Sequence, residues 1–114
     1  MSDCLFCDIV EGRVKGDIVY RDESVVAFKD IRPQAPVHIL VVPRKHVATM
    51  LDLEGGDSAV VGQIFLVIAR LAREQGIADR GFRVVVNSGA DAGQSVFHVH
   101  FHLLGGRPFR WPPG

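Results

Sequence analysis

The spacing of apolar positions along the chain predicts two helices. From residue 60 to residue 71, apolar side chains recur three and four positions apart, which is the period of an amphipathic helix. A long helix is therefore expected over residues 57–75, ended by Gly76. A second, short helix is expected over residues 5–11, ended by Gly12.

Short runs rich in β-branched residues predict the strands, which are expected at residues 17–20, 25–28, 37–42, 83–86 and 98–104. Strand neighbours joined by hairpins favour an antiparallel sheet over parallel strands wound through crossover helices. The predicted fold class is therefore α+β: a five-stranded antiparallel sheet with one long and one short helix. A length of 114 residues predicts a single domain over residues 1–114.

Composition is that of an ordinary globular chain, with 47% hydrophobic residues, 23% charged residues and a formal net charge of zero. Zero net charge provides no attraction to nucleic acids or to a membrane surface, so neither is expected as a partner. It also does not oppose self-association, which makes a homo-oligomer compatible with the sequence. The first residues lack the features of a targeting signal and no apolar run approaches the ~20 residues of a membrane span, so a cytoplasmic location is expected.

Each end of the chain has one unusual feature. Cys4 and Cys7, the two cysteines, form a C-x-x-C pair, which in a reducing compartment favours metal or redox chemistry over a structural disulfide. Residues 107–114 hold three prolines and the single tryptophan, Trp111, and such a tail forms no regular structure alone. Trp111 is expected to pack on another surface, for example that of a partner subunit.

Three of the five histidines alternate with apolar residues near the end of the chain, in the run His98-Val99-His100-Phe101-His102. On a strand, this period of two turns Val99 and Phe101 toward a core and all three histidines to the opposite face. Three interpretations are open: a polar face turned to solvent, a metal site, or a catalytic group.

Geometry restricts the metal interpretation. The outer two histidines of the run lie about 13 Å apart on a strand that rises about 3.3 Å per residue, whereas the ligands of one Zn²⁺ lie about 2.0–2.1 Å from the ion. One ion can therefore bind two of the three histidines. In the catalytic interpretation His100 is the nucleophile, because a hydrogen bond from one ring nitrogen to a carbonyl fixes its tautomer and leaves the other nitrogen free to attack phosphorus.

A glycine-rich segment, residues 89–95, precedes the histidine run and offers backbone N–H groups together with the side chains of Gln94 and Ser95. Asn87 adds another neutral donor. These groups suit a phosphate, and the glycines alone are equally typical of a plain hairpin turn. The chain has no Walker-type lysine motif and no dinucleotide-binding glycine fingerprint, which argues against kinase and dehydrogenase functions.

The run from His98 to Leu104 resembles the signature of the histidine triad (HIT) superfamily, and the likeness extends over nearly the whole chain. Further segments resemble the Hint branch, the histidine triad nucleotide-binding proteins: residues 30–38, 42–46, 86–87, 93–96 and the terminal Trp-Pro-Pro-Gly at 111–114. The resemblance implies a homodimer in which two five-stranded sheets join into one. It also implies hydrolysis of purine nucleoside phosphoramidates such as adenosine 5′-monophosphoramidate.

The resemblance also implies the residues of the active site. His100 attacks the α-phosphorus, an amine leaves, and water resolves the nucleotidyl-histidine. His38 sits behind His100 as an orienting partner, Asp30 binds the ribose hydroxyls, and Trp111 reaches toward the partner's site and influences the choice of leaving group. The groups near the phosphate are His102, Ser95, Asn87, Gly93 and Gln94. The base lies in an apolar pocket of Leu5, Phe6, Ile9, Phe28 and Ile31, although such residues are, by themselves, more typical of an ordinary core.

The two cysteines resemble those of the zinc-bearing bacterial members of the branch. The implied ligands are Cys4, Cys7, His46 and His98, a Cys₂His₂ set suited to tetrahedral Zn²⁺. Only one histidine of the triad then binds the metal, in agreement with the strand geometry. Four protein ligands leave no open position, so the ion would be structural and would fix the N-terminal helix to the sheet. The alternative is two reduced cysteines without a metal.

The leading hypothesis is thus a purine nucleoside phosphoramidate hydrolase that works through a covalent nucleotidyl-histidine. One alternative is cleavage of dinucleoside polyphosphates, as in another HIT branch, against which the Trp-Pro-Pro-Gly tail argues. A second is a nucleotide-binding dimer used as an interaction module, with incidental hydrolysis. A third, motivated by the cysteine pair, is a zinc-binding regulatory module.

Overall fold

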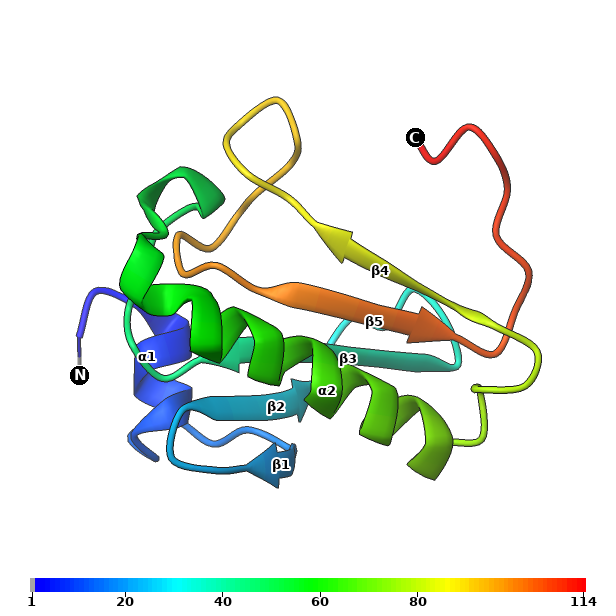
Figure 1. Ribbon diagram of the computed structural model, residues 1–114, viewed down its shortest axis with the longest axis horizontal. Helices are drawn as coiled ribbons and strands as arrows, with labels where there is room; N and C mark the ends of the chain where they lie inside the picture. Colours follow the sequence, from blue (N-terminus) through cyan, green and yellow to red (C-terminus); the bar gives the residue numbers. More distant parts are fainter. Residues whose placement is uncertain (1) are drawn as a thin grey trace.

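Five antiparallel strands form one sheet in the computed structural model, which describes residues 2–114 (Figure 1). The strand order is β1-β2-β3-β5-β4. The strands are β1 (Ile18–Arg21), β2 (Val25–Lys29), β3 (Val37–Pro43), β4 (Phe82–Val86) and β5 (Phe101–Gly105). The helices are α1 (Leu5–Val10) and α2 (Ser58–Glu74), with short 3-10 turns at Met50–Asp52 and Gly55–Asp57. The predicted α+β class, with its long and short helix, is confirmed.

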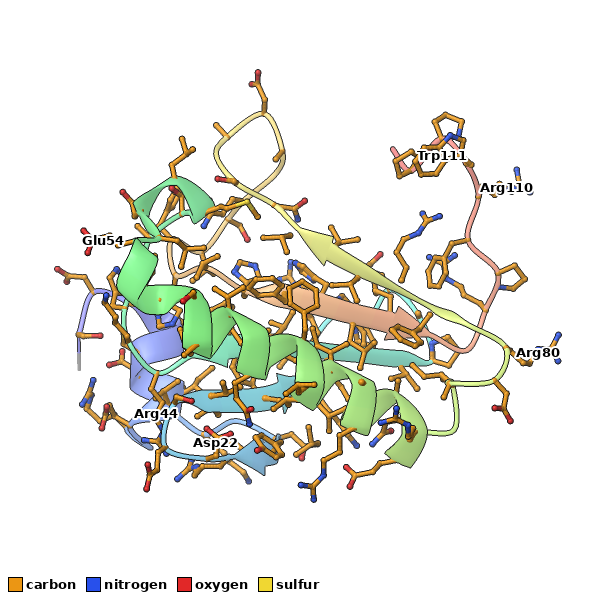
Figure 2. All side chains as sticks on the ribbon, in the orientation of Figure 1. Asp22, Arg44, Glu54, Arg80, Arg110 and Trp111 are labelled. Atoms are coloured by element: carbon orange, nitrogen blue, oxygen red, sulfur yellow. The ribbon has the colours of Figure 1, made fainter. Side chains whose placement is uncertain are left out.

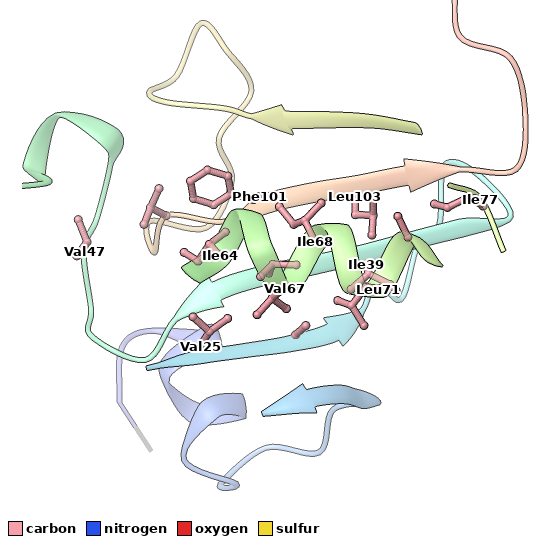
Figure 3. Close-up of a cluster of buried hydrophobic side chains, with 14 residues drawn as sticks. Val25, Ile39, Val47, Ile64, Val67, Ile68, Leu71, Ile77, Phe101 and Leu103 are labelled. Atoms are coloured by element: carbon pink, nitrogen blue, oxygen red, sulfur yellow. The ribbon is translucent and has the colours of Figure 1, made fainter. Parts of the chain in front are cut away.

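The two helices cover opposite faces of the sheet because side chains alternate along each strand. One face packs against the apolar side of α2, and its strand residues include Val25, Ala27, Ile39, Val41, Phe101 and Leu103 (Figure 3). Val99 lies in the same cluster, so the prediction that Val99 and Phe101 face a core is confirmed. The other face packs against α1 through Val26, Phe28, Leu40 and Val42. With only six residues, α1 covers part of that face and leaves room beside it.

The last strand starts later than predicted, at Phe101 instead of His98. The β3–β5 ladder begins with the pair Val41 and Phe101, and β3 ends at Pro43, which has no N–H for further pairing. The amide of Val99 instead donates to the carbonyl oxygen of Val47 at 2.6 Å, beyond the end of β3. His98 and His100 therefore lie in a connecting segment, and only His102 of the three belongs to the strand.

One side of the molecule carries apolar surface. β4 pairs with β5 along one edge, and no other strand within residues 2–114 pairs with its outer edge. Val84 and Val86 of β4 pack partly against the core beside α2, and Phe82 is half-exposed. α2 exposes Phe65 and Leu66. A bare strand edge next to exposed apolar side chains is a surface suited to association.

A second difference from the sequence analysis concerns α2. Together with the turn before it, this helix forms the stretch Gly55–Glu74, which by length and composition is long and apolar enough to cross a membrane, although no such stretch was expected. A core helix has the same profile. In the fold, α2 buries Ile64, Val67, Ile68 and Leu71 against the sheet.

The C-terminal tail leaves the fold beyond β5 and holds Trp111 away from it (Figures 1 and 2). The Phe109 ring lies near the guanidinium groups of both Arg83 and Arg107, at 5.2 and 4.3 Å from the ring centroid. Arg83 also donates to the carbonyl oxygen of Arg110 at 2.9 Å. These contacts hold the tail at its base, whereas the Trp111 side chain is 83% exposed and does not pack on its own chain as a tryptophan usually does.

Candidate functional site

A pocket of about 250 Å³ opens on the α1 face of the sheet, between α1, β2 and the start of β5. Nine of the residues expected around a nucleotide line it: Leu5, Phe6, Ile9, Phe28, Asp30, Ile31, Ser95, His100 and His102. Phe6 and Phe28 meet edge to face at its floor, with ring centroids 5.2 Å apart. The pocket therefore combines an aromatic floor with polar groups at one end, the usual composition of a small-molecule site.

The tautomer of His100 is fixed by the backbone. Its Nδ1–H donates to the carbonyl oxygen of His98 at 2.7 Å, because a carbonyl can only accept. The Nε2 atom therefore carries the lone pair. Burial lowers the pKa of His100, although the same hydrogen bond and the charge of Asp30 act in the opposite direction, so the ring is neutral near pH 7. Phe6 stands perpendicular to the ring at 5.0 Å and restricts its rotation.

His38 and His102 form a hydrogen-bonded relay whose direction is also fixed. The backbone N–H of Gln34 donates to His38 Nδ1 at 3.0 Å, so neutral His38 carries its proton on Nε2. That atom lies 2.8 Å from His102 Nδ1 and donates to it. His102 then carries its own proton on Nε2, which is buried and without a partner among the described residues. A buried unpaired donor that borders a pocket is suited to bind an acceptor on a ligand.

Electrostatics keep the relay neutral. Burial, together with the neighbouring His100 and His38, lowers the pKa of His102 to about 4, although the charge of Asp30 opposes the shift. Burial also lowers the pKa of His38, and the carboxylate of Asp30, 3.5 Å from its Nε2, opposes that shift. Near pH 7 both imidazoles are therefore uncharged, and His102 can release and take up a proton at Nε2 while the N–H of Gln34 holds His38 Nδ1.

The predicted placement of His38 behind His100 is wrong: His38 contacts His102. The register of the sheet explains the difference. Leu40 is paired with His102 and His38 with Leu104, so His38 lies diagonally next to His102 on the same face. His100 lies before the first pair of the ladder, and the orienting group behind it is the carbonyl of His98.

A second cluster lies next to the pocket, at the N-terminus of α1. The ligand atoms of Cys4, Cys7, His46 and His98 all lie within 4.8 Å of one another. His98 Nδ1 is 3.4 Å from each of the two sulfur atoms, and His46 Nδ1 is 3.3 Å from the Cys7 sulfur. The predicted set of four metal ligands is thus brought together, and the second group of ligand-type atoms among the described residues, Asp30, His38 and His102, contains no cysteine.

The chemistry of these donors fits a soft divalent cation. His98 Nε2–H donates to the carbonyl oxygen of Pro43 at 2.8 Å, so Nδ1 presents its lone pair to the cluster. Burial, together with the neighbouring Cys4 thiol, raises the pKa of the Cys7 thiol to about 11, so this thiol stays protonated unless a cation displaces the proton. Two sulfur and two imidazole ligands make a tetrahedral Cys₂His₂ set.

The glycine-rich loop is organised differently from the prediction. Gln94, expected beside the phosphate, is buried and uses its whole amide internally: Nε2 donates to the carbonyl oxygens of Ala48 and Val96, and Oε1 accepts from the N–H of Gly89. It shapes the loop and has no group left for a ligand. Ser95, the next residue, is exposed and lines the pocket. Asn87, Gly93 and Trp111 are not among its lining residues.

Several lining residues were not predicted. They are Lys15, Gly16, Asp17, Lys29, Arg32, Leu40 and Val96. Gly16 has a steric reason to be glycine, because a Cβ atom there would lie 2.7 Å from the Cγ2 of Ile9. A small residue is therefore needed where the α1–β1 loop passes α1. Lys15, Lys29 and Arg32 line the pocket together with the carboxylates of Asp17 and Asp30, and Lys29 lies 3.8 Å from Asp17, so charges of both signs surround it.

The sheet order and the histidine cluster fit a histidine triad (HIT) domain. A model of the HIT domain matches residues 11–109, and the chain belongs to the HIT domain family. An uncharacterized HIT-like protein of Synechocystis is 46% identical over 113 residues, 99% of this chain and 98% of that protein. The purine nucleoside phosphoramidase of Escherichia coli is 42% identical over 107 residues, 94% of this chain and 90% of that protein. The crystal structure of a HIT family hydrolase from Legionella pneumophila superposes with a TM-score of 0.96 at 45% identity and covers 98% of this chain and 100% of that one.

Proposed function

We propose that this hydrolase cleaves the phosphorus–nitrogen bond of purine nucleoside phosphoramidates, with His100 as the covalent nucleophile. The observation that carries the proposal is the tautomer of His100, whose Nε2 lone pair is free because Nδ1–H is bound to the His98 carbonyl. The 42% identity to a purine nucleoside phosphoramidase supports the choice of substrate.

The pocket accounts for binding of the nucleoside. A flat base stacks against the aromatic side chains of Phe6 and Phe28, while Ile31 is 90% exposed at the mouth and can close over it. The Asp30 carboxylate is held at the pocket wall by the N–H of Arg32, at 2.8 Å, and its other oxygen can accept from ribose hydroxyls. The phosphate then lies near His100, His102 and Ser95, all of which line the pocket.

The reaction proceeds in two displacements. His100 Nε2 attacks the α-phosphorus, a P–N bond to His100 forms, and the P–N bond to the amine breaks. The amine leaves with the proton of His102 Nε2. His38 keeps its own proton, because its Nδ1 accepts from the N–H of Gln34, and its Nε2–H donates to His102 Nδ1 and stabilises the ring that has lost the proton. Water then attacks the phosphorus and the bond to His100 breaks, which releases the nucleoside monophosphate. A proton from this water returns to His102 Nε2.

Zn²⁺ is the proposed occupant of the Cys4, Cys7, His46 and His98 cluster. With four protein ligands, such an ion would supply a structural cross-link between α1, the segment after β3 and the segment before β5. The link would stabilise the pocket wall, because Cys4 is the N-cap of α1, and α1 carries Leu5, Phe6 and Ile9 into that wall.

The proposed working assembly is a homodimer. Its interface is formed by the bare edge of β4 and the exposed residues of α2, and the tail of one subunit reaches its partner. The proposed location is cytoplasmic.

The experiment is incubation with adenosine 5′-monophosphoramidate, with release of AMP followed by chromatography and the protein quenched in denaturant for mass spectrometry. We expect turnover and an adenylyl group on His100. The His100→Ala protein should bind AMP and lose turnover by at least about 10⁴-fold. Unchanged turnover in His100→Ala would refute the proposed nucleophile, and binding of AMP without turnover in the unaltered protein would favour an interaction module.

A further inference from the structure

A second hollow adjoins the nucleotide pocket. It is a groove of about 620 Å³ on the outer side of the α1 N-terminus, directly over the metal cluster, because Cys4, Cys7 and His46 line it. The rest of its wall is Ser2, Asp3, Leu5, Ser95, Val96 and Phe97. Leu5, Ser95 and Val96 line both the groove and the nucleotide pocket, so the two hollows meet at these three residues. The groove therefore continues the pocket from the end at which the phosphate lies.

The nucleotide pocket is small for a whole substituted substrate. Sites for drug-sized ligands have volumes of about 300–1,000 Å³, and this pocket has about 250 Å³. This volume suits a nucleoside and leaves little space for a further substituent. In a phosphoramidate, any substituent on the nitrogen must then lie outside the pocket.

The direction of the reaction places that substituent in the groove. The attacking and leaving atoms are roughly in line at phosphorus. His100 attacks from the buried end of the pocket, since its side chain is only 5% exposed. The amine must then leave on the open side, and Ser95 is the exposed polar residue there.

We propose that this groove is the binding site for the amine leaving group, and that it selects amines with an apolar body and a positive charge. The inference rests on the proposed phosphoramidate substrate. Phe97 supplies the apolar surface: it lines the groove and is 50% exposed, so its ring is accessible to a ligand there. Asp3 supplies an exposed carboxylate. No lysine or arginine lines the groove, and the two thiolates of the metal cluster would balance the charge of a divalent ion bound there, so an ammonium group meets little net repulsion.

The test compares two substrates that share a nucleoside. One is adenosine 5′-monophosphoramidate, and the other carries on nitrogen a short chain with a phenyl ring and an ammonium group. We expect a higher kcat/KM for the substituted compound. Phe97→Ala should lower that preference about tenfold, and Asp3→Asn by about two- to fivefold, with turnover of the unsubstituted compound unchanged. Leu51→Ala and Asp79→Asn are matched controls on exposed residues outside both hollows.

Affinity provides a second readout that does not depend on turnover. The dissociation constants of both compounds are measured by calorimetry in the His100→Ala protein, with and without Phe97→Ala. A selective loss of affinity for the substituted compound supports the groove even if neither compound is hydrolysed, in which case the proposed function alone fails. Equal losses for both compounds, no effect of either substitution, or no preference for the substituted compound in the unaltered protein would overturn the groove proposal.

Discussion

Two clusters of ligand-type residues lie on the same face of this sheet, and they differ in one hydrogen bond. In each cluster the candidate ligand atoms all lie within 4.8 Å of one another: Cys4, Cys7, His46 and His98 in the first, and Asp30, His38 and His102 in the second. Distance alone would assign a metal to both. What distinguishes the two clusters is the backbone group that hydrogen-bonds to the ring nitrogen pointing away from the cluster, on His98 in the first and on His38 in the second.

In the first cluster the far nitrogen of His98 donates to a carbonyl, so the near nitrogen has a lone pair for a cation. In the second cluster the far nitrogen of His38 accepts from the N–H of Gln34, so the near nitrogen holds the proton. A cation there would have to displace that proton from an otherwise neutral imidazole. One backbone N–H in place of one backbone C=O thus separates a proton relay from a metal site.

The largest expected effect breaks the relay. His102→Ala removes the buried Nε2–H, and we expect kcat to fall about 10²- to 10⁴-fold, because the departing amine loses its acid. The metal content should not change. The comparison variant is His46→Ala, which should lose metal and retain more of kcat. A His102→Ala protein that also loses metal would contradict the separation of the two clusters.

The metal cluster is tested by its effect on stability. Cys7→Ser keeps the size of the side chain and removes a soft ligand, and we expect loss of the bound metal and about 4 kcal/mol of stability, the value for a ligand at about 1,000 times its Kd. Metal analysis and urea denaturation provide the two measurements. His38→Gln should leave the metal content at its original value. Equal stability of Cys7→Ser and the unaltered protein in the presence of zinc would rule out a structural ion.

The relay also predicts a dependence of stability on pH. The pKa of His102 is about 4 in the folded protein and about 6.5 in an unfolded chain. Above pH 6.5 the residue is neutral in both states, so it has no effect. Between pH 6.5 and 4 only the unfolded chain takes up the proton, and stability should fall by on the order of 2–3 kcal/mol.

This measurement uses urea denaturation of the Cys7→Ser protein, so that release of a metal at low pH does not contribute. His102→Gln in that background should show a flatter profile between pH 6.5 and 4. An identical slope in both proteins would mean that His102 does not carry the effect.

The smallest expected effect concerns the loop beside the relay. Gln94→Ala removes three internal hydrogen bonds, and we expect a loss of about 1–2 kcal/mol in thermal or urea unfolding. Because Gln94 has no group free for a ligand, affinity for AMP should change little. Unchanged stability with a large loss of AMP affinity would instead make Gln94 a direct ligand.

The sequence alone predicted correctly those features that depend on the spacing of neighbouring residues or on a recognisable motif. The helical period of α2 and the alternation around Phe101 predicted which side chains face the core, and the resemblance in the histidine run brought Cys4 and Cys7 together with His46 and His98. These features follow from local spacing or from a motif.

The errors concern contacts that depend on register or on a distant backbone group. The start of β5 depends on where β3 ends, at Pro43, and the partner of His38 depends on the pairing of Leu40 with His102. The amide of Gln94 is taken by the carbonyl of Ala48, 46 positions away. Neither spacing nor composition contains such information, because a shift of one residue in a ladder changes every contact across it.

Chain order has a consequence for how this protein becomes active during synthesis. His38 and His102 are 64 positions apart, and Cys4 and His98 are 94 positions apart. During synthesis, the cysteines and the first two histidines therefore emerge from the ribosome long before the residues they contact have been added to the chain. Closing such long loops costs conformational entropy that is not offset until the central strands pair. The growing chain carries neither a nucleophile in its final tautomer nor a complete metal site. Chemical reactivity in this protein arises only when the last strand, β5, is placed between β3 and β4.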